Sequence, residues 1–269
     1  MRYTILIDNM SVHMKFLAEW GYSGLLETAE GNILLDTGLR GSTLQHNLNA
    51  LHPFPRVDHI VLSHGHDDHC GGLSEALRLF PEARLWGSSC LSVERQSGKV
   101  SEHTRRNGGL SVVIPGAQTV GDSCMIVSGV QAFVVPEKYR NPQWVHSEGL
   151  WERGDDGLLH PDSFRDDLSL LVEGKKGVSL LLGCAHTGLP NILQYVREYF
   201  GISSLHAVIG GMHLSPVEEA AFPDWMEALH CISVDFWWPC HCTGFRAAAH
   251  LASLFPCVNW AGAGTWFDL

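Results

Sequence analysis

His64-Gly65-His66-Asp67-Asp68-His69 is the segment that says most about the structure and chemistry of this chain. The hexapeptide gathers three imidazoles and two carboxylates in six residues. It follows an apolar run over 57–63, typical of a buried strand, and precedes a glycine turn that leads into a predicted helix over 73–80. Open α/β sheets place their chemistry at the carboxyl ends of strands, so we expect the hexapeptide to form an active-site loop.

The residue types of the hexapeptide are those of a metal site. Imidazole nitrogens and carboxylate oxygens suit Zn²⁺, Mn²⁺ or Fe²⁺. Alternate residues of a short loop can converge on one ion, so we expect His64 and His66 to hold a first ion and Asp68 and His69 to face a second. The sequence therefore predicts two divalent metal ions, with zinc as the first expectation and manganese or iron as alternatives. The competing interpretation, a polar turn with unrelated histidines, leaves charges buried without partners.

Composition predicts a single compact domain over 1–269. Of 269 residues, 45% are hydrophobic and 17% are charged, which provides a sizeable core and argues against disorder. The formal charge of −11 repels a phosphodiester backbone, so we expect a small-molecule substrate and no nucleic acid. The sequence shows neither the ~20 apolar residues of a membrane span nor a signal peptide, so we expect no membrane association and a cytoplasmic location. The sequence indicates no particular oligomeric state.

The regular segments fall into two halves. The first half contains predicted strands over 3–8, 23–27, 32–36, 57–62 and 83–87. The second half contains a predicted hairpin of strands 168–173 and 178–182, then helix 190–200, strand 205–209, helix 216–230 and strand 234–238. Hairpins and surface helices in both halves predict an α/β (α+β) fold, a four-layer αβ/βα sandwich with two sheets packed face to face. The weakly patterned stretches near 92–120 and 136–165 are expected to be insertions at the mouth of the site.

Three apolar strands of the second half end in histidine-bearing turns. The histidines are His186, His213 and His241, which follow the strands predicted over 178–182, 205–209 and 234–238. This recurrence is typical of an α/β active site, because the ends of neighbouring strands meet at one edge of a sheet.

Several motifs resemble a known family. The hexapeptide matches the His-x-His-x-Asp-His signature of the metallo-β-lactamase superfamily, and Gly31–Gly38 (GNILLDTG) resembles that superfamily's first motif. Three later segments resemble one branch, which includes proteins named for 7,8-dihydropterin-6-yl-methyl-4-(β-D-ribofuranosyl)aminobenzene 5'-phosphate synthase: 183–188 (GCAHTG), 210–214 (GGMHL) and 239–244 (PCHCTG). The resemblance implies the sandwich fold and a dinuclear metal site.

The chain departs from the superfamily pattern in its middle section. Gly183-Cys184 stands where the superfamily has Gly-Asp, and the segment 164–168 has no histidine where the pattern expects one. The most economical expectation is that His186 reaches the first metal. Cys184 then either bridges the metals as a thiolate or supports a ligand from outside the metal's own ligand set.

The remaining candidates complete the predicted centre. His241 matches the last superfamily motif and is expected to join Asp68 and His69 at the second metal. His213 is either a ligand, a substrate contact or a structural turn residue. Asp36 is expected to orient the hexapeptide backbone or a ligand imidazole, and Asp67 could do the same.

These motifs predict a metal-dependent hydrolase that acts on a small ester, lactone or phosphoester through metal-activated hydroxide. Asp68 is the expected catalytic residue, which steers the nucleophile or takes its proton. One alternative is a synthase that transfers a pterin or ribosyl-phosphate group; another is a non-hydrolytic metal-binding or redox protein. Basic residues near the expected mouth could hold a phosphorylated substrate or form a solvated surface: Arg105, Arg106, Lys138 and Arg140. The sequence shows no P-loop and no dinucleotide fingerprint, which argues against ATP hydrolysis and nicotinamide chemistry.

Overall fold

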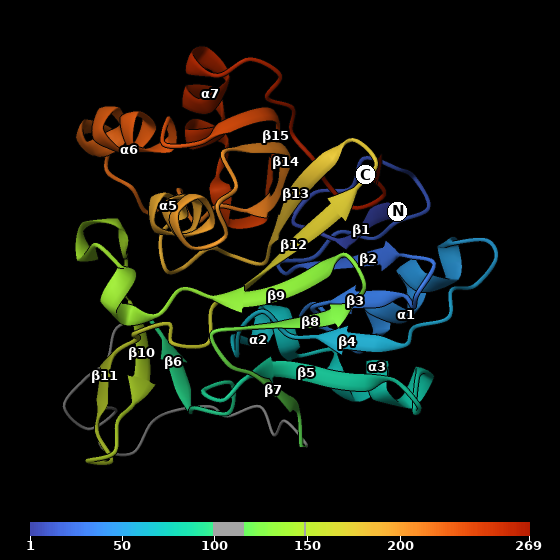
Figure 1. Ribbon diagram of the computed structural model, residues 1–269. Coiled ribbons are helices and arrows are strands. Elements are labelled where there is room, and N and C mark those ends of the chain that lie inside the picture. The colour runs from blue at the N-terminus through green and yellow to red at the C-terminus, as the bar shows by residue number, and fades with distance from the viewer. Residues whose placement is uncertain (99–115, 148) are drawn as a thin grey trace.

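The computed structural model describes residues 1–98, 116–147 and 149–269 and shows the predicted four-layer sandwich (Figure 1). Two sheets pack face to face, and helices cover the outer face of each. A third, small sheet lies beside them.

The strands have the following order and bounds. The first sheet runs β16 (Trp266–Asp268), β1 (Arg2–Ile7), β2 (Ser23–Glu27), β3 (Ile33–Leu35), β4 (His59–Val61), β5 (Arg84–Ser88) and β7 (Gln118–Val120). The second runs β15 (Ser233–Cys240), β14 (Ser204–Gly211), β13 (Gly177–Leu182), β12 (Leu168–Gly174), β9 (Val130–Val134) and β8 (Ser123–Val127). The small sheet runs β11 (Leu159–Pro161), β10 (Leu150–Arg153) and β6 (Arg95–Ser97).

The helices divide between the two outer layers and the loops. Those of the first half are α1 (Gly41–Ala50), α2 (Asp67–Cys70) and α3 (Leu73–Leu79). Those of the second half are α5 (Leu189–Tyr199), α6 (Phe222–Leu229) and α7 (Phe245–Leu254). Short 3₁₀ turns are η1 (Glu137–Tyr139), η2 (Pro142–Trp144), η3 (Glu219–Ala221) and η4 (His241–Thr243). Within the described ranges, every helix is too short or too polar to cross a membrane.

Strands buried on both faces explain the continuous apolar runs of the sequence. In β3, Leu34 packs with Leu44 of α1 and Ala76 of α3, whereas Ile33 and Leu35 belong to the core between the two sheets. Successive side chains of a strand point to opposite faces, so a three-residue strand contributes to two layers of packing. Burying each leucine or isoleucine stabilises the fold by roughly 1.5–3 kcal/mol.

Parallel pairing brings the ends of distant strands to one edge. β3 pairs with β4 in parallel, and β13, β14 and β15 pair in parallel in the other sheet. Their carboxyl ends carry the loops with Asp36, the hexapeptide, Cys184, His213 and His241. The fold therefore collects the chemically active residues of both halves in one place.

Backbone strain concentrates at the same edge. Asp36 (φ 57°), Ala185 (φ 60°), His213 (φ 45°) and His241 (φ 50°) each lie in the left-handed region within three residues of a strand end. Such conformations cost about 1–3 kcal/mol each for residues other than glycine, and they persist only where the surroundings fix them.

Most elements predicted from periodicity are present, with one clear error. The hairpins β2–β3 and β12–β13 are confirmed, and the helix predicted over 190–200 is α5. The helix predicted over 216–230 is wrong in its first part, where η3 precedes a shorter α6. Pro223 stands in the first turn of α6, where its missing N–H is tolerated; a helix continuing from residue 216 would need that N–H.

The weakly patterned stretches contain short elements that the sequence did not reveal. Residues 95–97 pair with 150–153, and 150–153 pair with 159–161, to form the small sheet. Strands of three or four residues are too short to show a period. Residues 99–115 and 148 lie outside the described part of the chain.

Candidate metal centre

Among the described residues, four overlapping groupings of possible metal ligands lie at the strand-end edge, and two of them consist of the residues singled out from the sequence. One ligand atom from each of His64, His66 and His186 lies within 4.8 Å of the others. Asp68, His69 and His241 form a second cluster by the same measure. The structure thus brings the six residues singled out from the sequence together, in the two groups of three that were expected.

Hydrogen bonds behind the rings of the second cluster set which nitrogens face each other. His69 Nδ1 lies 2.7 Å from Asp36 Oδ2, and His241 Nδ1 lies 3.0 Å from Asn9 Oδ1. Both oxygens are acceptors, so both Nδ1 atoms carry a proton. In neutral imidazoles each Nε2 atom then carries a lone pair. The two Nε2 atoms face each other at 3.1 Å. This contact is repulsive unless a proton or a metal ion lies between the two nitrogens.

The first cluster is arranged in the same way. Ser63 Oγ donates to Asp36 Oδ2 at 2.7 Å and therefore accepts from His64 Nδ1 at 2.8 Å. His64 Nε2 is left as a buried lone pair without a hydrogen-bond partner among the described residues. His66 Nε2 donates to Asp162 Oδ2 at 3.2 Å, so His66 Nδ1 presents a lone pair toward His186 Nε2, also at 3.2 Å.

These inward lone pairs fit divalent cations. Neutral imidazole nitrogens and one carboxylate are ordinary ligands for zinc and its neighbours. A hydrogen bond from the outer nitrogen of a ligating histidine is the usual support for such a ligand. The donor set and the unpartnered His64 Nε2 therefore suit a metal centre, with three protein ligands available in each cluster.

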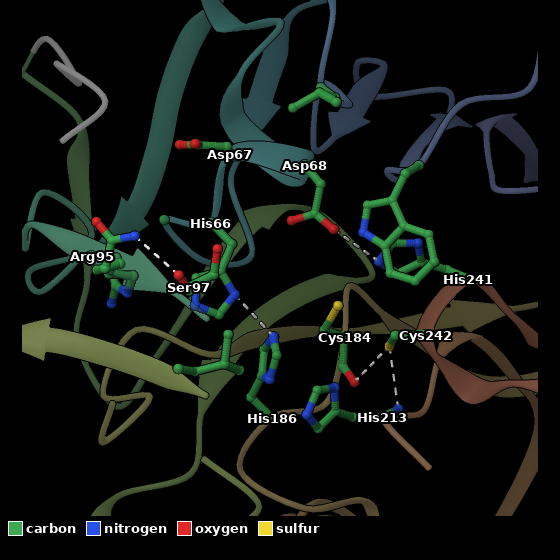
Figure 2. A pocket seen from close by; sticks show the side chains of 15 residues that line it. His66, Asp67, Asp68, Arg95, Ser97, Cys184, His186, His213, His241 and Cys242 are labelled. Atoms are coloured by element: carbon green, nitrogen blue, oxygen red, sulfur yellow. Dashed lines mark hydrogen bonds and ion pairs between the residues drawn. The ribbon is translucent and has the colours of Figure 1, made fainter. Parts of the chain in front are cut away.

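The Asp36 carboxylate links the two clusters, because it bonds to His69 of the second cluster and to Ser63, which bonds to His64 of the first. This fully buried carboxylate accepts from the Ser63 backbone N–H and the Ser63 hydroxyl as well as from His69. Asp36 therefore orients both the hexapeptide backbone and an imidazole, as the sequence predicted. Asp67 does not share this role in Figure 2, where its carboxylate points away from the labelled imidazoles.

A buried ion-pair network supports His66 from the other side. Arg95 Nε lies 2.9 Å from Asp162 Oδ2, the carboxylate that accepts from His66, and another Arg95 nitrogen lies 2.7 Å from Asp166 Oδ1. Asp166 Oδ2 accepts the Gly65 backbone N–H at 2.8 Å. All three charged side chains are buried, so their mutual pairing is required to offset the loss of hydration.

Sequence reasoning missed this network and also Asp8 and Asn9. Asp8 Oδ2 accepts the His241 backbone N–H at 2.8 Å, and Asn9 accepts from the ring. Asp8-Asn9 directly follows an apolar strand, which is the signal that identified the other loops. The pairing of Arg95 with Asp162 joins residues 67 positions apart, and nothing in the local pattern indicates it.

The centre holds groups whose pKa values are shifted in opposite directions. Burial and the neighbouring imidazoles hold the pKa of His64 and that of His186 well below their usual range. Burial also lowers the pKa of His69, but the carboxylates of Asp36 and Asp68 outweigh it and raise that pKa to about 9. Burial opposes ionisation of Asp68, yet His69 and His241 lower the pKa of its carboxyl. Without metal, the proton of the second cluster therefore resides on His69.

A cavity of about 350 Å³ opens over both clusters. Trp20 is 64% exposed at its mouth, with its ring 5.9 Å from that of His241. Residues of the small sheet also form the wall, among them Gln96, Ser97 and Leu150. Figure 2 shows the cavity with His66 and His186 on one side and Asp68 and His241 on the other. The volume suits a small organic molecule.

The remaining candidates have these positions. Cys184 and His213 line the cavity, and the His213 ring lies 4.1 Å from the His186 ring. Arg140 donates to two backbone carbonyls, and Lys138 lies over the ring of Tyr139. Neither of these cations lines the cavity, so the expectation that they lie at its mouth is wrong for the described structure. Arg105 and Arg106 fall outside the described residues.

Comparison with known proteins gives matches over most of the chain. The family model described as the metallo-beta-lactamase superfamily matches residues 21–197. The uncharacterized protein MJ0448 of Methanocaldococcus jannaschii is 30% identical over 260 residues, which cover 93% of each chain. The same organism's 7,8-dihydropterin-6-methyl-4-(beta-D-ribofuranosyl)-aminobenzene-5'-phosphate synthase is 25% identical over 270 residues, 91% of this chain and 88% of that one. The crystal structure of Tm1679, described as a metal-dependent hydrolase of the beta-lactamase superfamily, superposes with a TM-score of 0.81 at 24% identity and covers 100% of this chain and 98% of its own.

We predict that metal uptake by the second cluster depends on pH through His69. With a pKa of about 9, His69 is protonated at neutral pH, so an ion entering beside it must displace that proton. Affinity for this ion should rise about tenfold per pH unit from pH 7 and level off above the pKa of His69. His64 and His186 stay neutral, so these two imidazoles release no proton to an ion in the first cluster. Titration calorimetry in buffers of different ionisation enthalpy counts the released protons; two ions that both bind without proton release would contradict the assignment.

We predict that Asp36→Asn weakens metal binding without preventing folding. The two carboxylate oxygens accept three hydrogen bonds, and an amide replaces one of these oxygens by an NH₂ group. That NH₂ must face either the Ser63 backbone N–H or the pair of donors formed by the Ser63 hydroxyl and the His69 ring. Loss of such support for ligating residues typically costs 10–100-fold in metal affinity. Competition with a chelator measures the affinity, and circular dichroism checks the fold. Unchanged affinity in a folded variant would show that the clusters do not bind metal through these rings.

Proposed function

The chain belongs to the metallo-β-lactamase superfamily, and on that basis we propose that it is a metal-dependent hydrolase of a small ester, lactone or phosphoester. The observation that carries the proposal is the set of inward lone pairs in two clusters at the floor of one cavity. Divalent ions bound there lower the pKa of water toward neutrality and polarise a carbonyl or phosphoryl oxygen.

Asp68 is the residue best placed to act on the reacting atoms. Its Oδ2 lies 3.5 Å from His241 Nε2 and 4.0 Å from His69 Nε2, and its side chain is 20% exposed toward the cavity. The nearby imidazoles lower the pKa of its carboxyl, so it is ionised at neutral pH. An ionised carboxylate in this position can orient a water molecule and accept its proton.

The walls of the cavity favour a substrate with both a polar and an apolar end. Leu39, Leu150 and the exposed Trp20 provide apolar surface, and the two clusters provide the polar floor. Arg95, a cation in the described wall, is already paired with two carboxylates. The described wall therefore has no unpaired Lys or Arg to bind a charged group of the substrate, and an uncharged ester or lactone does not need one.

A second candidate is a synthase that transfers a dihydropterin group to a ribosyl-phosphate compound. The match to the dihydropterin–ribofuranosylaminobenzene phosphate synthase over 91% of the chain favours it. In that case the clusters hold ions that neutralise a departing anionic group, and Trp20 provides a face on which a flat ring can stack.

The two candidates are separated by a substrate panel. The protein is loaded in turn with Zn²⁺, Mn²⁺ and Fe²⁺, and metal content is measured before each assay. The panel contains carboxylic esters, lactones, phosphomonoesters and phosphodiesters, and a mixture of a dihydropterin carrying a leaving group on its 6-methyl carbon with a ribofuranosylaminobenzene phosphate. Turnover of an ester, lactone or phosphoester supports the hydrolase; product in the mixture alone supports the synthase. Silence across the panel from fully loaded protein would overturn both and favour a metal-binding or redox role.

We predict that Asp68→Asn lowers turnover of a verified substrate by about 10²-fold or more, the usual effect of losing a positioned proton acceptor. The amide keeps the size and one oxygen of the side chain but removes its charge. His59→Asn is the control, because His59 lies at the start of β4, accepts from Trp86 Nε1 at 3.0 Å and lies outside the cavity wall. Steady-state kinetics with equal losses in both variants, or full turnover by Asp68→Asn, would contradict the role given to Asp68.

A further inference from the structure

We propose that Cys184 is a thiolate ligand shared by both metal ions, which gives the centre a preference for thiophilic cations such as Zn²⁺, Co²⁺ and Fe²⁺ over Mn²⁺. The inference rests on the two-metal centre of the proposed function and adds a ligand to it. No electron transfer is involved: the S–H proton is released to solvent, and the sulfur donates its lone pairs to the two cations.

The position of the Cys184 sulfur carries the proposal. Sγ lies 3.0 Å from His69 Nε2, the nitrogen that faces the second cluster. It also lies within 4.8 Å of a ligand atom of His64 in the first cluster and of His241 in the second. Figure 2 shows Cys184 between the His66–His186 side and the Asp68–His241 side. An atom that neighbours ligands of both clusters is placed to touch an ion in either one.

The backbone holds this sulfur in place. A side chain at Gly183 would put its Cβ 2.2 Å from Ser63 Oγ and 3.0 Å from Asp36 Oδ2, so only glycine lets the end of β13 lie this close to the hexapeptide loop. The Gly183 carbonyl accepts from Gly211 N–H at 3.1 Å, and Ala185 turns the chain through a left-handed conformation. The residues directly before and after Cys184 thereby hold its backbone in place.

Charge balance favours a thiolate at this point. The two clusters offer five imidazoles, which are neutral as ligands, and the single carboxylate of Asp68. Two divalent ions there bring four positive charges against that one ligand carboxylate and the buried Asp36 carboxylate behind His69, in a site whose histidines are mostly buried. Uncompensated charge away from water is costly. Cys184 is 3% exposed and neighbours ligands of both clusters, so its thiolate would supply a further negative charge to ions held there.

Cys242 is a matched neighbour with different contacts. Its sulfur accepts the His213 backbone N–H at 3.3 Å and donates to the Cys184 carbonyl at 3.5 Å. Among the described groupings that could hold a metal, Cys242 appears with Cys184 and His241, and not with any residue of the first cluster. Cys242 is therefore a buried cysteine of the same cavity that cannot serve both ions.

The experiment uses Co²⁺ as the probe, because a thiolate on cobalt gives a near-ultraviolet charge-transfer band that nitrogen and oxygen ligands do not give. Full-length wild type, Cys184→Ser, Cys184→Asp and Cys242→Ser are loaded under argon, and bound cobalt is counted by elemental analysis. We expect two ions and the band in wild type and in Cys242→Ser. Cys184→Ser should lose the band and up to one ion, and Cys184→Asp should hold two ions without the band.

The possible results separate this inference from the proposed function. A band that persists in Cys184→Ser, or that disappears in Cys242→Ser alone, overturns the assignment to Cys184. Two bound ions without a band in wild type also overturn it, while leaving the hydrolase proposal intact. Failure of wild type to bind cobalt at all would refute the metal centre itself. Competition between Zn²⁺ and Mn²⁺ completes the test: wild type should discriminate between them more strongly than Cys184→Asp.

Discussion

Hydrogen bonds at the backs of the imidazole rings are the interactions on which this centre depends. Asp36, Asn9 and Asp162 accept protons from the outer nitrogens of His69, His241 and His66, and each bond forces the lone pair of that ring inward. His69 Nε2 and His241 Nε2 are thereby held 3.1 Å apart, a contact that needs a proton or a metal ion between the two nitrogens. An ion entering the second cluster takes the place of the proton that His69 carries without metal, and the hydrogen bonds behind the rings keep both nitrogens aimed at that position.

The scaffold makes such crowding possible because both sheets contribute to one edge. The cores on either side of each sheet bury its strands on both faces, so the strand ends are held in place. Left-handed residues such as Asp36 and His241 then absorb the sharp turns that aim side chains at the centre. The packed cores thus fix the positions of the candidate metal ligands.

The sequence predicted the parts of this arrangement that are local. His64, His66, Asp68 and His69 come from one loop whose spacing is diagnostic, and His186 and His241 follow apolar strands that periodicity reveals. Pairings between residues far apart in the sequence are not indicated by any local pattern of this kind. The contact of Asp162 with His66 joins residues 96 positions apart, and nothing in the local pattern around Arg95 indicates that it pairs with Asp162. Strands β8 and β9 form an antiparallel hairpin between the two weakly patterned stretches and are absent from the predicted strands.

The distance along the chain between the two halves of the second cluster has a consequence for how the protein acquires its metal. His69 and His241 are 172 positions apart, and Asn9 is 232 positions from the ring that it orients. Closing loops of that length is entropically unfavourable until the core between the sheets has formed. A nascent chain still lacking β15 can therefore offer only Asp68 and His69, two of the three ligands of this cluster, to an ion. Tight uptake must follow folding rather than guide it, and the free energy of binding then stabilises the completed sandwich as a whole.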